Sequence, residues 1–84
     1  MELLSYSPVK GEFRWKRNRA RTAKAGDVAG TIHRGYCRIR IDGTSYLAHR
    51  LAWLHEHGAF PLGDLDHING DRSDNRLSNL REAT

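Results

Sequence analysis

The chain has 84 residues, enough for one small domain whose core is barely large enough to be stable. Its 14 Lys and Arg outnumber its 10 Asp and Glu, so the net charge of +4 excludes an acidic protein that mimics DNA. A single cysteine, Cys37, excludes an intrachain disulfide and a structural zinc site built on cysteine pairs. The sequence shows no secretory signal and no apolar run near the roughly 20 residues of a membrane-spanning helix. We therefore expect a cytoplasmic protein that forms one domain, residues 1–84.

Residues 1–27 are expected to form a hairpin followed by a basic loop. Tyr6, Phe13 and Trp15 alternate with polar residues, which is typical of a half-buried pair of strands. The turn between these strands is expected around Pro8 and Gly11. From position 16 onward the segment has no apolar face, so its composition favours a loop.

Basic side chains are concentrated between positions 10 and 24, where Glu12 is the only acidic residue. A run of like charges at this density suits a polyanion such as a nucleic-acid backbone. A solvated surface loop explains the same composition, and Phe13 and Trp15 fit either a binding surface or the core. The nucleic-acid contacts predicted here are Arg14, Lys16, Arg17, Arg19, Arg21 and Lys24.

Residues 28–60 are expected to form a small sheet and one helix. Strand-like composition is present at residues 28–33 and 36–41, and Asp42-Gly43 is a strong hairpin signal that leads into a third strand. Alternation along the middle strand buries Ile39 and places Arg38 and Arg40 on the outer face. That basic face either follows a phosphate backbone or is simply solvated.

Residues 47–57 have the clearest helical pattern, with leucines at the first, fifth and eighth positions. Ser45 is the expected N-cap, and Gly58 is expected to end the helix. His49 and Arg50 lie beside the apolar stripe. A lone histidine at such a position is more often structural than catalytic, and Arg50 is expected to brace a carboxylate or a phosphate.

The most informative stretch is residues 65–81. Asp66 and His67 follow one another in a short strand, and Asn69-Gly70 supplies a turn before a polar loop. A second short strand is expected to return beside the first. On the residues alone, Asp66 and Asn69 are either turn residues or site residues, and Asn79 either caps the returning strand or belongs to the site.

Several blocks of the chain, in order and at matching intervals, resemble the HNH endonuclease family in its phage and homing variety. The blocks are Ala48-His49-Arg50-Leu51-Ala52-Trp53, Asp66-His67-Ile68-Asn69-Gly70-Asp71, Asp74-Asn75-Arg76 and Ser78-Asn79-Leu80-Arg81-Glu82-Ala83-Thr84. The resemblance implies an α+β domain in which a small antiparallel sheet and a hairpin pack on one helix. Residues 61–84 would then form the ββα-metal unit of that family.

Position by position, the resemblance implies that Asp66 binds a divalent ion, Mg²⁺ or Mn²⁺, and that His67 is the general base of phosphodiester hydrolysis. Asn79 matches the central asparagine of the family, whose amide pins the loop and orients the histidine. Supporting roles would fall to His49, Arg50 and Asn75. The further phosphate contacts implied are Arg72, Arg76 and Arg81.

In the family, a helix follows the second strand and contributes a further metal ligand, His or Asn. The sequence stops at Thr84, where that helix would begin, so we expect a truncated motif in which Asp66 is the only protein ligand left. The missing helix would leave an apolar seam around Ile68, Leu77 and Leu80. Such a seam favours a homodimer or a protein partner.

Three functions remain open at this point. The first is a metal-dependent DNA endonuclease, or the truncated core of one, acting in the cytoplasm of a bacterial host if it is phage-encoded. The second is a shortened, non-catalytic relative that binds nucleic acid or inhibits a nucleic-acid-handling complex, as a small phage-encoded inhibitor would. The third is an interaction module whose basic face meets an acidic protein.

Overall fold

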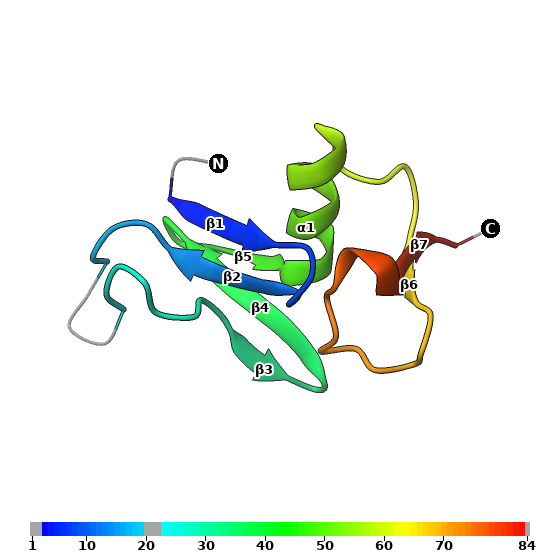
Figure 1. Cartoon of the computed structure of the whole chain (residues 1–84), viewed down its shortest axis with the longest axis horizontal. Coiled ribbons are helices and arrows are strands. Elements are labelled where there is room, and N and C mark those ends of the chain that lie inside the picture. The colour runs from blue at the N-terminus through cyan, green and yellow to red at the C-terminus, as the bar shows by residue number, and fades with distance from the viewer. Residues whose placement is uncertain (1–2, 20–22, 84) are drawn as a thin grey trace.

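The computed structural model describes residues 3–19 and 23–83. Its elements in chain order are β1 (Leu4–Ser7), β2 (Glu12–Trp15), β3 (Thr31–His33), β4 (Tyr36–Ile41), β5 (Thr44–Leu47), the helix α1 (Ala48–His57), β6 (Leu65–His67), the 3₁₀ turn η1 (Leu77–Asn79) and β7 (Leu80–Glu82). They form the antiparallel pairs β1–β2 and β6–β7 and a three-stranded antiparallel sheet in the order β3–β4–β5. Figure 1 shows the β1–β2 hairpin lying over the three-stranded sheet, with β6, β7 and their loop at the other end of the molecule. The predicted α+β architecture is confirmed.

The β1–β2 hairpin supplies a large part of the core. In its register Leu4 pairs with Trp15 and Tyr6 pairs with Phe13, and none of these four residues is more than 8% exposed. Because side chains alternate between the two faces of a strand, the four share the face that packs on Ile39 and the rest of the core. The alternation of the sequence therefore predicts this hairpin correctly.

The three-stranded sheet contains the predicted tight turn at Asp42 and Gly43, whose φ angles are +48° and +85°. Two consecutive positive φ values match the twist of the flanking strands, β4 and β5. On β4, Ile39 is fully buried, whereas Arg38 and Arg40 are exposed on the opposite face. The predicted division of β4 into an apolar and a basic face is confirmed.

The strand predicted at residues 28–33 is too long, because β3 begins only at Thr31. Gly30 adopts a φ of +106°, and a Cβ at this position would lie 2.6 Å from the sulfur of Cys37. The chain therefore bends sharply at Gly30, where it passes close to β4. Before the bend, Val28 forms an isolated bridge with Arg14 and thus runs beside the hairpin.

Helix α1 packs its apolar stripe on the core, and its buried apolar residues are Ala48, Leu51 and Ala52. The prediction of Ser45 as the N-cap is wrong. Strand β5 continues through Leu47, which takes the N-cap position in an extended conformation without a side-chain cap. Gly58 ends the helix as predicted, in the left-handed conformation. No helix in the described part of the chain is long and apolar enough to span a membrane.

Strands β6 and β7 pair so that Asp66 lies opposite Arg81 and His67 lies opposite Leu80. Residues 68–76 form the polar loop between them, and η1 leads into β7. Leu80 is only 6% exposed and belongs to the core, so the predicted apolar seam is wrong at this residue. It is covered because it shares the inward face of this strand pair with His67. Ile68, by contrast, is 52% exposed.

Candidate active site

His67, the last residue of β6, lies in a buried polar cluster and is 8% exposed. Its Nε2 is 2.9 Å from Oδ1 of Asn75, a loop residue that is itself 2% exposed. Because an amide oxygen only accepts hydrogen bonds, the imidazole donates this bond from Nε2. The neutral ring then carries its lone pair on Nδ1, which is the state that a general base requires.

Two aromatic side chains enclose the His67 ring. His49 of α1 packs against it edge-on with 4.9 Å between the ring centroids, and the ring of Tyr36 lies 6.2 Å away. Burial lowers the pKa of His49 to about 4, with smaller contributions from His67 and Arg50. His49 is therefore neutral at pH 7 and adds no charge beside His67. Its buried Nδ1 has no hydrogen-bond partner within the described residues.

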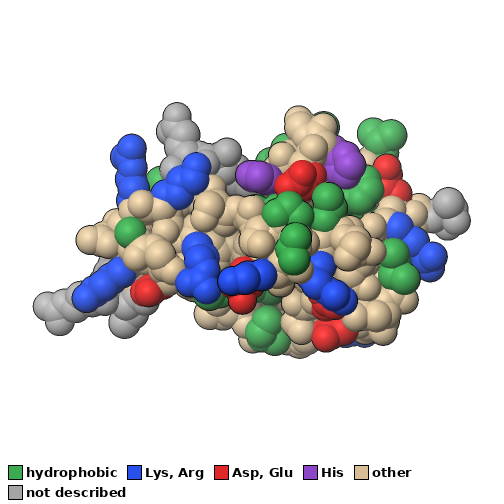
Figure 2. Space-filling model, viewed as in Figure 1, with side chains coloured by type: hydrophobic (Ala, Val, Ile, Leu, Met, Phe, Trp, Pro, Cys, Tyr) green, Lys and Arg blue, Asp and Glu red, His purple; other side chains and the backbone are tan. Residues whose placement is uncertain are grey.

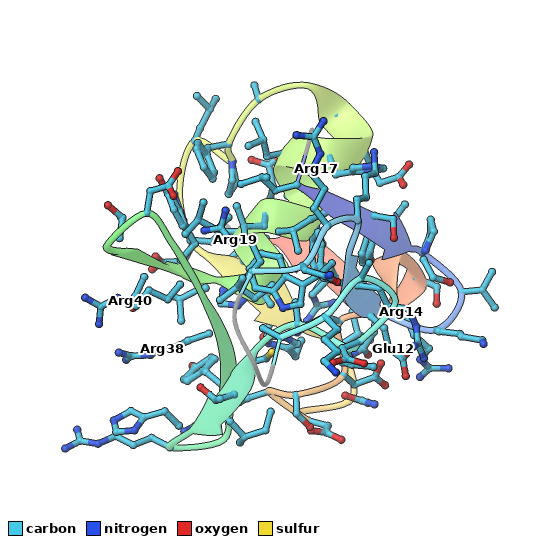
Figure 3. The ribbon with its side chains drawn as sticks, turned by 90° about the vertical axis from the view of Figure 1, so that its left-hand side faces the viewer. Glu12, Arg14, Arg17, Arg19, Arg38 and Arg40 are labelled. Atoms are coloured by element: carbon cyan, nitrogen blue, oxygen red, sulfur yellow. The ribbon has the colours of Figure 1, made fainter. Side chains whose placement is uncertain are left out.

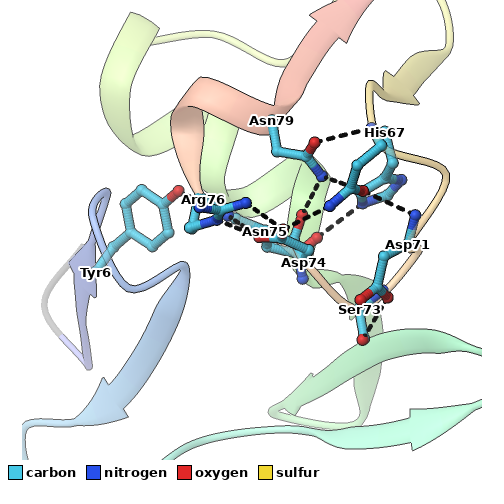
Figure 4. A network of polar contacts seen from close by, with 9 residues as sticks. Tyr6, His67, Asp71, Ser73, Asp74, Asn75, Arg76 and Asn79 are labelled. Carbon is cyan, nitrogen blue, oxygen red and sulfur yellow. Dashed lines mark hydrogen bonds and ion pairs between the residues drawn. The ribbon is translucent and has the colours of Figure 1, made fainter.

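The side chain of Asn79 forms hydrogen bonds to the loop and none to His67. Its Oδ1 accepts a hydrogen bond from the backbone N–H of Asn69 at 3.0 Å. Its Nδ2 donates to Oδ1 of Asn69 at 3.0 Å and to the carbonyl of Asp74 at 2.9 Å (Figure 4). The resemblance implied that one asparagine would pin the loop and orient the histidine. In the structure Asn79 makes the bonds to the loop, and Asn75 makes the bond to the imidazole.

The carboxylates of Asp71 and Asp74 accept hydrogen bonds from other residues of the same loop. Oδ1 of Asp71 accepts hydrogen bonds from the backbone N–H and the hydroxyl of Ser73, at 3.0 and 2.7 Å. Asp74 accepts two hydrogen bonds from the Arg76 guanidinium, at 2.8 and 2.7 Å. The hydrogen bond from Arg76 is the main cause that lowers the pKa of Asp74 to about 2. This ion pair engages the guanidinium that was predicted to contact phosphate.

We expect Asp74→Asn to reduce the loss of stability at low pH. The pKa of Asp74 falls from an ordinary 3.8 to about 2 on folding, so its ionised form stabilises the protein above about pH 4. That contribution disappears as the pH falls from about 4 toward about 2. The variant should be less stable than the wild type at pH 7, and its urea midpoint should fall less between pH 5 and pH 2.

The matched control for this measurement is Asp42→Asn, since the carboxylate of Asp42 is 80% exposed although it also pairs with an arginine. Its urea midpoint should follow that of the wild type across the same pH range. Equal acid sensitivity of the Asp74→Asn variant and the wild type would contradict the stabilising role of the ionised Asp74.

Asp66 precedes His67 in β6, so its side chain points to the other face of the strand, where it is 47% exposed. Arg81 donates from Nε and Nη2 to Oδ2 of Asp66, at 3.1 and 2.9 Å. Oδ1 accepts no hydrogen bond from the described residues. A hollow of about 370 Å³ beside the pair is lined by Asp66, Arg81, Glu82 and Ala83. Within residues 3–19 and 23–83, no three His, Cys, Asp or Glu side chains group closely enough to hold a metal ion between them.

Some of the arginines predicted to contact nucleic acid already have hydrogen-bond or ion-pair partners within the protein, and others do not. Several of them have intramolecular partners: Arg14 bonds to Glu12 and the Gly26 carbonyl, Arg19 to Asp42, Arg72 to the Arg34 carbonyl, Arg76 to Asp74 and Arg81 to Asp66. Lys16 also interacts within the chain. Arg50 donates to the Gly63 carbonyl and so braces the connection that leads to β6, rather than a carboxylate.

Four predicted cations are exposed and have no side-chain partner within the described residues; they are Arg17, Lys24, Arg38 and Arg40. Figure 3 shows Arg38 and Arg40 extending from one side of the molecule, with Arg14 and Glu12 on the other. Figure 2 shows lysine and arginine side chains spread along one whole face, from the hairpin to the end that carries β6 and β7. Arg21, which was predicted with them, lies outside the described residues.

Sequence reasoning missed two contributors to the His67 cluster. The sequence indicated no role in the site for Tyr36, although its ring lies beside both His49 and His67. Tyr6 was assigned only to the hairpin, although its hydroxyl donates to the carbonyl of Asn75. No local signal identifies Tyr6, because it lies 69 residues from Asn75 in the chain.

Residues 46–84 match the sequence model of the HNH endonuclease family. The matched segment holds α1, β6, β7 and the loop that carries Asn75. This segment is therefore similar in sequence to the HNH endonuclease family. The match includes His67, Asn75 and Asn79 of the buried cluster, whereas Tyr6 and Tyr36 lie outside the matched segment.

The fold is also similar to that of a solved HNH structure, described as "DNA binding and cleavage by the HNH homing endonuclease I-HmuI". The two superpose with a TM-score of 0.64 at 26% sequence identity, over 96% of this chain and 46% of the other. The chain thus spans about half the length of this relative, and the similarity includes the hairpin that precedes the HNH segment. No curated protein sequence matched the chain.

Proposed function

We propose that the chain is the core of a metal-dependent DNA endonuclease that hydrolyses phosphodiester bonds. The observation that carries this proposal is the state of His67, which is buried, bonded through Nε2 to Asn75 and left with a basic Nδ1. It lies in the segment that matches the HNH endonuclease family, and the residue before it in β6, Asp66, carries a half-exposed carboxylate on the other face of the strand. The description of the solved relative, which names DNA binding and cleavage, supports the same reaction class and substrate.

Hydrolysis of a phosphodiester requires a base that activates water. Nδ1 of His67 would take a proton from the water molecule as its oxygen attacks phosphorus, and the bond from phosphorus to the leaving sugar oxygen then breaks. Asn75 keeps the ring proton on Nε2, so that Nδ1 remains the acceptor. Asn79 holds the loop that positions Asn75, because it bonds to Asn69 and to the Asp74 carbonyl.

The donor chemistry at Asp66 fits a hard divalent ion such as Mg²⁺ or Mn²⁺. Its carboxylate is half-exposed, and Oδ1 accepts no hydrogen bond from the described residues. When bound, such an ion stabilises the negative charge that develops on the phosphate oxygens. Asp66 would hold it on the hollow that Arg81 also lines, and Arg81 would remain close enough to contact a phosphate.

The exposed cations Arg38 and Arg40 of β4 are proposed to contact the DNA backbone. Neither is neutralised by a neighbour among the described residues, so each offers a full charge to a phosphate. We expect the double variant Arg38→Ala/Arg40→Ala to bind duplex DNA more weakly. It makes two fewer phosphate contacts, so its binding releases about two fewer counterions from the DNA. The slope of log K against log salt should decrease by about one for each residue replaced.

Fluorescence anisotropy at several salt concentrations measures this slope. The control is Arg14→Ala, whose guanidinium pairs with Glu12 and bonds to the Gly26 carbonyl. Its slope should stay close to that of the wild type. An unchanged slope for the double variant would show that β4 does not face the DNA.

The test of the proposed function is plasmid cleavage by the chain with Mg²⁺, with Mn²⁺ and with EDTA. Nicked or linear product that requires the metal supports the nuclease. Salt-sensitive DNA binding without any cleavage would instead favour the shortened, non-catalytic binding protein. Absence of both would overturn both proposals and direct the search to an acidic protein partner.

A further inference from the structure

The β1–β2 hairpin touches the loop directly behind His67. The backbone N–H of Leu77 donates to the carbonyl of Pro8 at 3.0 Å. Gly11, at a φ of +70°, lies so close that a Cβ there would overlap the backbone nitrogen of Arg76 and come within 2.6 Å of the Asn75 carbonyl carbon. The hairpin turn is therefore in backbone contact with residues 75–77, and no larger residue than glycine fits at position 11 without a shift.

Tyr6 extends this contact to the residue that holds the histidine. Its hydroxyl donates a buried hydrogen bond of 2.5 Å to the backbone carbonyl of Asn75. The side chain of the same Asn75 accepts the hydrogen bond from Nε2 of His67 (Figure 4). Asn75 thus accepts a hydrogen bond from Tyr6 at its backbone carbonyl and one from His67 at its side chain. Any shift of the Asn75 backbone moves the acceptor on which the imidazole depends.

The hydroxyl and the ring of Tyr6 make different contacts, so a substitution can remove one and keep the other. The ring packs on Phe13 with 4.7 Å between centroids and on His55 with 5.6 Å, and these contacts do not need the oxygen. Burial is the main cause that raises the pKa of Tyr6 to about 12. The hydroxyl therefore keeps its proton, and remains a donor, at neutral pH.

We propose that Tyr6 is a positioning residue of the active site, which sets the tautomer and orientation of His67 through Asn75. The proposal rests on the proposed nuclease function for its kinetic consequence, and on geometry alone for its effect on the imidazole. Tyr6 lies outside residues 46–84, so the matched HNH segment would depend on a side chain that the family match does not include.

Tyr6→Phe tests this proposal because it removes the hydroxyl and keeps the ring. Long-range ¹H–¹⁵N NMR of the imidazoles reports which nitrogen of His67 carries the proton. The wild type should show His67 as a single tautomer protonated on Nε2, and Tyr6→Phe should show a mixture of the two tautomers. In the cleavage assay, kcat should fall about tenfold while KM stays unchanged, since the base is misplaced but the binding surface is intact.

The matched control is Tyr46→Phe, which removes the hydroxyl of a half-buried tyrosine with no hydrogen-bonded partner among the described residues. It should leave the His67 tautomer and kcat as in the wild type. An unaltered His67 spectrum in Tyr6→Phe would overturn the proposal. A mixed tautomer in a chain that cleaves no DNA would uphold the positioning by Tyr6 and reject only the nuclease function.

Discussion

Replacing His67 with alanine should lower kcat for metal-dependent DNA cleavage by roughly 10³-fold, within the 10²–10⁴-fold range that a positioned general base contributes. The variant lacks the group that accepts the proton of the attacking water, so the loss falls on the chemical step. The affinity for DNA should stay close to that of the wild type, because the exposed cations of β4 are untouched. Single-turnover cleavage and anisotropy measured on the same preparation separate the two effects.

Because His67 is only 8% exposed, its removal also opens a cavity, so a second variant is needed. His67→Gln keeps an amide N–H that can donate to Asn75, but it provides no base. It should be as inactive as His67→Ala while it unfolds closer to the wild-type temperature. The matched control is His33→Ala, since His33 is exposed on β3. Substantial cleavage by His67→Gln would show that another group is the base.

Replacing Asn79 with alanine should produce the largest loss of stability in the loop. The side chain is 5% exposed and makes three hydrogen bonds, with the backbone N–H and Oδ1 of Asn69 and with the carbonyl of Asp74. Its removal leaves these groups without their partners, at about 1 kcal/mol each, so we expect a loss of about 3 kcal/mol. In a domain of this size that corresponds to a decrease in Tm of roughly 12–24 °C.

Thermal unfolding followed by circular dichroism measures this change. Asn18→Ala is the matched control, because the exposed Asn18 makes a single side-chain bond with the described residues, to the N–H of Ala25. Its Tm should decrease by only a few degrees, in line with one bond of about 1 kcal/mol. A comparable Tm for the two variants would show that Asn79 does not hold the loop. If Asn79→Ala remains folded at 20 °C, its cleavage activity should also fall, since Asn75 loses its support.

The local features of this fold follow from the sequence because each depends on residues a few positions apart. Alternation of Tyr6, Phe13 and Trp15 predicts the hairpin, and the tolerance of Asp42-Gly43 for positive φ predicts the turn between β4 and β5. The predicted start of helix α1 and the predicted start of strand β3 were wrong, and each error has a local cause. Ser45 failed as an N-cap because β5 continued beyond it, and residues 28–30 left the sheet because Gly30 packs closely against Cys37.

The sequence indicates candidate site residues, but it does not reveal the partners of each side chain. The adjacent Asp66 and His67 and the polar loop after them are visible in the sequence, and the family resemblance adds Asn75 and Asn79. Which asparagine bonds to the imidazole was not visible, since both lie in the loop region and both carry the same amide. The charge of Arg76 and Arg81 was predicted for phosphate, but in the structure each pairs with a carboxylate.

The sequence by itself determined the elements, the turns and the stretch that carries the proposed chemistry, because these depend on neighbours within one or two turns of the chain. Tertiary structure decided which partners the site residues have. The bond from His67 to Asn75 joins residues 8 apart, that from Asn69 to Asn79 residues 10 apart, and that from Tyr6 to Asn75 residues 69 apart. The first two bonds lie within the β6–β7 unit, whereas the third requires the hairpin to pack against its loop. Burial then makes each of them costly to lose, because water cannot replace the missing partner.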